Sequence, residues 1–279
     1  MAEPTLYPES GFRRLRIDIA YDGTNFSGWA RQPGKRTVQE MVEEVISRIA
    51  RHDVDSVVAG RTDAGVHATG QVIHIDIPET PFADGLSYKD LRYKLNRILD
   101  EDVRIMEISD APEGFHARFS ALRRVYTYKI LDNNDVIPPL SRYDVAPWYR
   151  PLDADLMNQA SALVLGHHDF AAFCKFKEGG TTIRTLEKYQ WQRDEAGLLV
   201  AEVIADAFCY SMVRNLVGAV VCVADGRKDP SWMAELLANK ERVSDSLVFP
   251  ARGLSLTRVD YPSDQELLDR AKVTIAKRA

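Results

Sequence analysis

Two kinds of hydrophobic periodicity alternate along the first half of the chain, and their order restricts the possible fold more than any other feature. Residues 15–21 alternate apolar and polar side chains, which predicts a strand. Apolar residues of 38–49 recur at helical spacing and predict a helix. Further elements are expected in the order strand, strand, helix and strand, at 54–59, 70–77, from Ser87, and at 102–108. The order β-α-β-β-α-β is that of a split βαβ, ferredoxin-like unit.

Both predicted helices of this half carry start signals. Thr37 and Glu40 have the spacing of a capping box, in which each side chain satisfies a free backbone N–H of the first turn. Ser87 precedes the second helix, with Asp90 three residues later. We therefore expect the helices to begin at 37–38 and 87–88.

The second half repeats this order of elements with larger insertions. Strands are expected at 124–131, 183–192, 198–205 and 254–261, and helices at 153–165, at about 210–224 and at 232–238. The helix at 153–165 is expected to present Leu156, Ala160, Leu163 and Val164 on one face, and 194–197 to form a turn. The predicted fold is α+β, with two ferredoxin-like halves around a central, mainly antiparallel sheet and an active-site cleft between them.

These elements divide the chain into four parts. Residues 1–12 are expected to be a disordered lead-in, 13–112 and 113–262 to be α+β subdomains, and 263–279 to be a charged surface helix or tail. Three cysteines are an odd number and form no C-x-x-C pair, so neither a disulfide framework nor a cysteine zinc site is expected. We find no apolar run that could cross a bilayer and no signal peptide, and expect a cytoplasmic protein.

Charge alone does not indicate a nucleic-acid partner, because the formal net charge is -5, from 36 basic and 41 acidic residues. Local clustering matters more than the sum for phosphate binding. Basic residues do cluster, at 13–16, 31–36 and 118–124. Each cluster alone is also compatible with an ordinary solvated face.

The segment GRTDAGVHA at 60–68 lies between two predicted strands and is the strongest candidate for chemistry. Gly60 and Gly65 permit a tight loop, and the loop projects Arg61, Asp63 and His67. An aspartate in such a turn also commonly only bonds nearby backbone. Taken alone, this segment leaves a hairpin turn and a catalytic loop both open.

The segment GRTDAGVHATGQV resembles the catalytic segment of the tRNA pseudouridine synthase A (TruA) family. Other segments resemble the family in the same order: YDGTNFSGWARQPGKRTVQE at 21–40, FHARFSA at 115–121 followed by RRVYTYKI, GHHDFAAF at 166–173, FCYSMVRNLVGAV at 208–220, and ARGLSL at 251–256. Together they cover most of residues 15–261. The resemblance implies the pseudouridine synthase fold and an isomerase that converts uridine in tRNA to pseudouridine.

The resemblance also implies roles for individual residues. Asp63 matches the family's aspartate nucleophile, and Arg214 matches the arginine that pairs with it. Tyr126 matches the tyrosine that stacks on the target base, whereas Tyr128 is expected to be an ordinary strand aromatic. Arg61 and His67 are expected to contact the substrate. The resemblance further implies action on the anticodon stem-loop at tRNA positions 38–40, no cofactor and no metal, and a homodimer.

Two other classes of protein remain as alternatives. A metalloenzyme would use His67, His167, His168 and Asp169 as ligands, but no H-x-x-x-H or H-E-x-x-H pairing supports it. A non-catalytic RNA-binding protein could use RRM-like halves, but the aromatic RNP1 pattern of that module is absent. An assay for pseudouridine formation distinguishes the second alternative from the enzyme.

Overall fold

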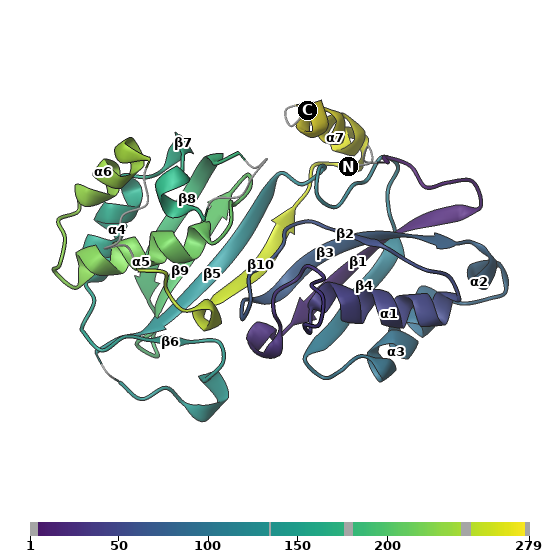
Figure 1. Cartoon of the computed structure of the whole chain (residues 1–279), viewed down its shortest axis with the longest axis horizontal. Helices are drawn as coiled ribbons and strands as arrows, with labels where there is room; N and C mark the ends of the chain where they lie inside the picture. The colour runs from purple at the N-terminus through teal and green to yellow at the C-terminus, as the bar shows by residue number, and fades with distance from the viewer. Residues whose placement is uncertain (1–4, 134, 176–180, 241–246, 277–279) are drawn as a thin grey trace. The chain divides into compact units, whose positions relative to one another are not determined.

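The computed structural model describes residues 5–133, 135–175, 181–240 and 247–276 (Figure 1). The chain divides into two compact units. The first unit runs to Leu122 and includes the chain from Thr257 onward, and the second unit is Arg123–Leu256.

The sheet order in the first unit is β4-β1-β3-β10, with β2 paired to β3. The pairs β1–β3, β1–β4 and β2–β3 are antiparallel. Its strands are β1 (Phe12–Tyr21), β2 (Ser56–Val58), β3 (His67–Pro78), β4 (Val103–Asp110) and the end of β10 (Leu254–Asp260). Ile17 pairs with Ile73 of β3 and with Ile108 of β4. All three side chains are buried, as the alternation of apolar residues predicted.

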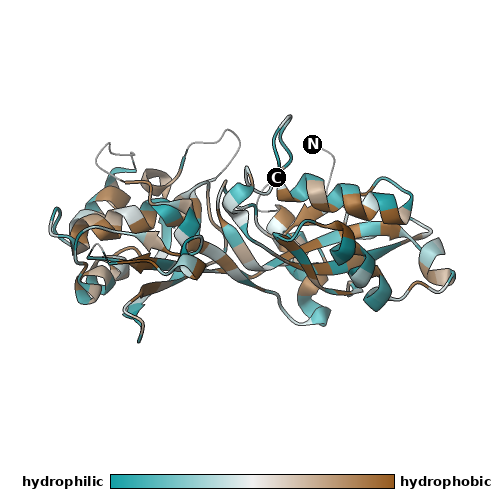
Figure 2. Ribbon diagram, turned by 90° about the horizontal axis from the view of Figure 1, so that it is seen from below, coloured by the Kyte–Doolittle hydropathy of each residue, from teal (hydrophilic) through white to brown (hydrophobic). Residues whose placement is uncertain are grey.

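The helices of the first unit are α1 (Val38–Ala50), α2 (Thr80–Ala83), α3 (Tyr88–Ile98) and α7 (Leu267–Ala276). The predicted start of α3 is confirmed, because the Ser87 side chain accepts a hydrogen bond from the Asp90 amide. Figure 2 shows that helices of the molecule carry both hydrophilic and hydrophobic residues. Leu91 and Leu95 of α3 are buried, as an amphipathic helix requires.

The predicted capping box of α1 is wrong. Thr37 occupies the N-cap position but makes no side-chain capping bond, and its buried hydroxyl has no hydrogen-bond partner among the described residues. The first amides of the helix bond elsewhere: Val38 donates to the carbonyl of Gly28 at 3.3 Å and Gln39 to that of Trp29 at 3.0 Å. A preceding loop therefore caps α1 through its backbone.

The second unit has a sheet in the order β10-β5-β9-β8-β7, with the short β6 parallel to β5. The pairs β5–β9, β8–β9 and β7–β8 are antiparallel. The strands are β5 (Arg123–Leu131), β6 (Ala146–Pro147), β7 (Gly166–Asp169), β8 (Ile183–Arg193), β9 (Leu199–Ala205) and the start of β10. The pairs β5–β9 and β8–β9 involve strands that the sequence predicted.

The helices of the second unit are α4 (Ala154–Ala162), α5 (Met212–Ala224) and α6 (Trp232–Asn239). Part of the predicted face of α4 is wrong, because Leu163 is 44% exposed whereas Met157 is buried. The helix ends at Ala162, so Leu163 no longer follows its periodicity. Short 3-10 helices complete both units, at Gly23–Asn25, Pro139–Ser141, Ala171–Phe173, Ala251–Gly253 and Asp264–Glu266.

The unit boundaries differ from the expected 112/113 and 262/263. The amide of Ala117 donates to His74 of β3 at 3.0 Å, and the hydroxyl of Tyr261 donates to the Ala117 carbonyl at 2.7 Å. These bonds hold the 113–122 segment in the first unit. In the expected tail, α7 buries Leu267 and Ala271 in that unit.

Part of the expected disordered lead-in is ordered. Residues 1–4 of the expected disordered lead-in lie outside the described residues, but Thr5 accepts a hydrogen bond from Arg14 at 3.3 Å and β1 already begins at Phe12.

The expectation of no disulfide is wrong, because Cys174 is bonded to Cys209, with their Cα atoms 5.8 Å apart. The fold brings together two segments 35 residues apart, which cysteine spacing could not indicate.

Candidate active site

The loop that carries Asp63 connects β2 to β3 in the first unit. The amide of Val66 donates to the Asp63 carbonyl at 3.1 Å, and Gly65 has a φ of +77°. Glycine adopts this left-handed conformation without the steric cost that other residues incur. Asp63 is half-buried and Arg61 is exposed, so the loop presents both residues as the sequence predicted.

A second loop, residues 22–29, packs directly on the backbone of the Asp63 loop. Trp29 donates its amide to the Thr62 carbonyl at 3.1 Å, and Gly65 donates its amide to the Phe26 carbonyl at 3.2 Å. A Cβ at Gly28 would lie 2.8 Å from the Thr62 carbonyl oxygen, and one at Gly23 would lie 2.0 Å from that of Val66. Only glycine allows these two close approaches. No local pattern in the sequence indicates these two contacts, because they join segments far apart along the chain.

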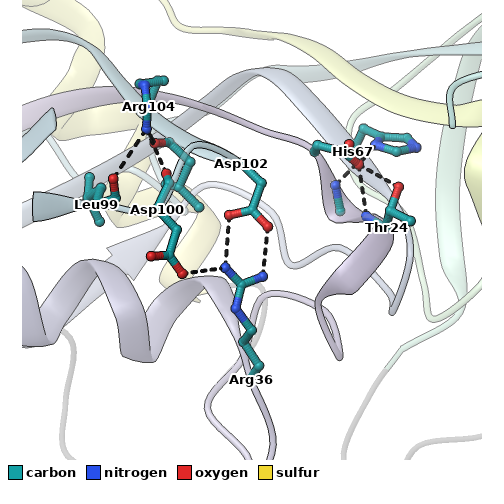
Figure 3. A network of polar contacts seen from close by, with 10 residues as sticks. Thr24, Arg36, His67, Leu99, Asp100, Asp102 and Arg104 are labelled. Atoms are coloured by element: carbon teal, nitrogen blue, oxygen red, sulfur yellow. Dashed lines mark hydrogen bonds and ion pairs between the residues drawn. The ribbon is translucent and has the colours of Figure 1, made fainter. Parts of the chain in front are cut away.

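His67 lies at the start of β3 with 7% of its surface exposed. Its Nδ1 accepts the Gly23 amide at 3.0 Å and lies 3.1 Å from Oδ1 of Asp22 (Figure 3). The amide and hydroxyl of Thr24 donate to the same Asp22 oxygen. Burial opposes ionisation of Asp22, but the hydrogen bonds from Thr24 lower its pKa. His67 thus joins the Asp63 loop to the neighbouring loop.

Arg36 links the loop of residues 22–29 to the turn that precedes β4. Its guanidinium makes two bonds to Asp102, at 2.7 and 2.9 Å, and one to Asp100 at 2.8 Å (Figure 3). It also lies over the Phe26 ring, 4.0 Å from the centroid. Hydrogen bonding to Asp102 is the main cause that raises the pKa of Arg36. Arg36 is therefore held in place by the protein itself.

Several other arginines of the three basic clusters are likewise engaged within their own unit. Arg14 is 6% exposed and pairs with Asp76 through two bonds, and Arg16 pairs with Asp18. In the second unit Arg123 pairs with Glu187, and Arg124 is buried and donates to the Asp206 carbonyl. Clustering in the sequence therefore overstates the number of arginines available to a phosphate backbone.

Tyr126 and Tyr128 both lie on β5 in the second unit. Tyr126 is 5% exposed, and its ring meets that of Phe208 edge-on at 5.0 Å. Tyr128 is fully buried and donates its hydroxyl to the Pro250 carbonyl. Burial raises the pKa of Tyr128, with the nearby charges of Arg214 and Arg252 acting in the opposite direction. Tyr128 is a core residue, as the sequence analysis favoured.

Arg214 differs in burial from the rest of α5, a helix whose residues are all described. Every residue of this helix except Arg214 is buried. The Arg214 Nε donates to the Phe249 carbonyl at 2.8 Å, and the Phe249 amide donates to the Arg214 carbonyl at 3.1 Å. Side chain and backbone of Arg214 are thus both fixed by one segment of the second unit.

Two histidines of the metalloenzyme alternative, His167 and His168, form hydrogen bonds within the second unit. His167 bonds Thr185 at 3.0 Å, and His168 bonds the Leu165 carbonyl at 2.8 Å. Within the described residues, no group of three or more His, Cys, Asp or Glu side chains is placed to hold a metal ion. The same part of the chain contains no helix of the length and apolarity needed to cross a membrane.

Comparisons with known proteins agree with the motifs. A family model for tRNA pseudouridine synthase matches residues 18–120 and 160–262. The chain is 51% identical to a tRNA pseudouridine synthase A of Frankia casuarinae, over 96% of each chain. It is 51% identical to that of Streptomyces griseus, over 94% of this chain and 93% of the relative, and 47% identical to that of Mycobacterium leprae, over 94% of each. The chain therefore belongs to the tRNA pseudouridine synthase A family, isomerases that convert uridine to pseudouridine.

Proposed function

We propose that this protein isomerises uridine to pseudouridine in the anticodon stem-loop of tRNA, at positions 38–40, with Asp63 as the nucleophile and without a cofactor. The observation that carries the proposal is the half-buried Asp63, presented by a loop whose backbone is held on both sides by close contacts. The names of the relatives support tRNA as the substrate.

The reaction breaks the N1–C1′ glycosidic bond, turns the base and joins it to the sugar through C5. The C5 proton must leave and N1 must gain a proton, so no atoms are added overall. An ionised carboxylate can promote bond cleavage by forming a covalent adduct or by taking a proton from the sugar. Asp63 supplies that carboxylate in either route.

Arg214 is proposed to keep Asp63 ionised in the presence of substrate. A carboxylate beside a desolvated base favours its neutral form unless a cation compensates. A guanidinium stays charged and can bond both carboxylate oxygens. The fixed position of Arg214, as the one residue of the fully described α5 that is not buried, supports this assignment.

Tyr126 and Arg61 are proposed to contact the RNA. Tyr126 would stack on the target base, and its edge-on contact with Phe208 fixes the plane of its ring. Arg61 is exposed two residues before the nucleophile and would contact a phosphate of the flipped-out nucleotide. His67 was expected to contact the substrate, but its ring is buried and its Nδ1 faces Asp22 and Gly23, so its proposed role is to hold the loop.

A homodimer and a cytoplasmic location complete the proposal. Both rest on the family resemblance, and the homodimer would place a second copy of this chain beside the bound tRNA. A cytoplasmic location would give the enzyme direct access to its substrate.

The decisive experiment replaces Asp63 by asparagine, which removes the charge and keeps the shape. Asp63→Asn is expected to abolish tritium release from C5-labelled tRNA while leaving tRNA affinity within about twofold of wild type. The exposed Asp53 of the same unit offers a control, and Asp53→Asn should retain full activity in the presence of a chelator. Pseudouridine formation by a clean Asp63→Asn preparation would show that another residue is the nucleophile.

A further inference from the structure

We propose that Tyr21, Thr62 and Gln71 form a buried network that positions Asp63 for the reaction, so that none touches RNA and each acts through the loop. The inference rests on the proposed role of Asp63 as nucleophile. The three residues come from β1, the loop and β3, and their side chains meet beneath the loop.

The hydrogen bonds run in a defined order from the sheet to the loop. Gln71 Nε2 donates one hydrogen to the Gly60 carbonyl at 2.8 Å and one to the Tyr21 hydroxyl at 3.2 Å. With that hydrogen accepted, the Tyr21 hydroxyl can donate its own to Thr62 Oγ1, 2.8 Å away. The side-chain amide of Gln71 therefore orients the Tyr21 hydroxyl, and this hydroxyl holds the side chain of Thr62, the residue before Asp63.

Burial makes this order costly to disturb. Gln71 is fully buried, Tyr21 is 5% exposed and Thr62 is 7% exposed. Burial also raises the pKa of Tyr21 to about 12, so its hydroxyl stays protonated over the working range of pH. A buried polar group that loses its partner pays the full desolvation cost, so the bonded arrangement is strongly preferred.

The network complements contacts from the other side of the loop. The Thr62 side chain bonds Tyr21, whereas its carbonyl accepts the Trp29 amide. The Gly60 carbonyl is held by Gln71, and the Gly65 amide is held by Phe26. Bonds thus fix the backbone at positions before and after Asp63. A shift of about 1 Å in a reacting group can lower a rate roughly 100-fold, which is the reason such support matters.

The test removes one hydroxyl at a time. Tyr21→Phe should lower the single-turnover rate at saturating enzyme by about 10-fold to 100-fold and leave tRNA affinity unchanged, because Tyr21 does not reach the RNA. Tyr189→Phe is the matched control, since Tyr189 is an equally buried tyrosine on β8 of the second unit, and should keep the wild-type rate.

The threonine supplies a conservative rescue. Thr62→Val keeps the shape but loses the hydroxyl and should be impaired, whereas Thr62→Ser keeps the hydroxyl and should recover most of the rate. Combining Tyr21→Phe with Thr62→Val should cost little more than either change alone, because both break the same bond. Additive losses, or a Thr62→Ser variant as slow as Thr62→Val, would overturn the network.

Amide hydrogen exchange gives a reading that does not depend on turnover. In Tyr21→Phe the amides of Gly65 and Val66 should exchange faster than in wild type and in Tyr189→Phe. Unchanged exchange would refute the network even if Asp63 is the nucleophile. An active Asp63→Asn enzyme would instead refute the proposed function, and the exchange result would still decide whether the network holds the loop.

Discussion

Two buried histidines of the first unit, His74 and His116, accept backbone hydrogen bonds through Nδ1. His74 accepts the Ala117 amide, and His116 accepts those of Arg118 and Phe119. Burial lowers the pKa of both rings, that of His116 to about 4, and the charge of Arg14 acts in the same direction. Each ring therefore stays neutral in the folded protein under mildly acidic conditions.

These histidines should make stability depend on pH at the level of single residues. Between about pH 6.5 and 4 the unfolded chain binds a proton at His116 that the folded protein does not, so the free energy of unfolding should fall as the pH falls. For His116 the loss should approach about 3 kcal/mol and level off below pH 4. Arg118 adds to the effect, and Asp76 opposes it.

The matched variant for this prediction is His116→Asn. Asparagine can accept the same backbone amides through its side-chain oxygen but cannot be protonated in this range. Urea unfolding from pH 4 to pH 8 gives the free energy of unfolding as a function of pH. Its slope should be smaller in the variant, because residue 116 then binds no proton on unfolding. Identical slopes for the two proteins would mean that His116 is already charged when folded.

At the scale of elements, two glycines allow the packing of residues 22–29 on the Asp63 loop to be tested. Gly28 lies in this contact and Gly34 lies outside it. Gly28 and Gly34 both have positive φ, +95° and +70°, so alanine at either position should cost roughly 1 to 2 kcal/mol in backbone strain. Only at Gly28 would the added Cβ also meet the loop backbone, because nothing lies within 4 Å of the position at Gly34.

Gly28→Ala should therefore lose activity beyond its loss of stability. The single-turnover rate at saturating enzyme should fall at least about 10-fold in Gly28→Ala and stay near wild type in Gly34→Ala. Urea unfolding of both variants measures the shared cost of the strained backbone. Equal rates in two equally destabilised variants would mean that the loop tolerates displacement.

Local sequence signals predicted elements well where the signal and its partner are adjacent. The Ser87 cap and the turn at 194–197 are confirmed, the latter by bonds from the Ala196 and Leu198 amides to the Asp194 side chain. The strand β7 was missed, because its four residues alternate too briefly and it is defined by its pairing with β8. The prediction of a capping box at α1 was wrong for a related reason. The first amides of this helix donate to the carbonyls of Gly28 and Trp29, which lie in a preceding loop.

In the candidate site, too, local features could be predicted from the sequence, whereas contacts between distant segments could not. The sequence located the loop of Asp63, the exposure of Arg61 and the core position of Tyr128. It could not show that Tyr21 meets Thr62 and Gln71, because 41 positions separate Tyr21 from Thr62 and 50 separate it from Gln71 along the chain. Contacts of this kind depend on strand register, which propensities and motifs do not fix.

At the scale of the whole molecule, the net charge of -5 and the internally paired arginines raise the question of how the protein holds a polyanion. Each phosphate contact releases counterions, so tRNA affinity should fall with salt even for an acidic protein. The size of the fall should reflect the number of contacts, and not the number of basic residues in the clusters.

Arg61 and Arg123 allow that distinction to be measured. Arg61 is exposed on the loop of Asp63, so Arg61→Ala should reduce the slope of log affinity against log salt by about 0.7 to 0.9, the loss of one phosphate contact. Arg123 pairs with Glu187, so Arg123→Ala should leave the slope unchanged. Equal reductions would mean that RNA displaces the internal acidic partner, and a flat plot for the wild-type enzyme would mean that phosphate contacts contribute little to binding.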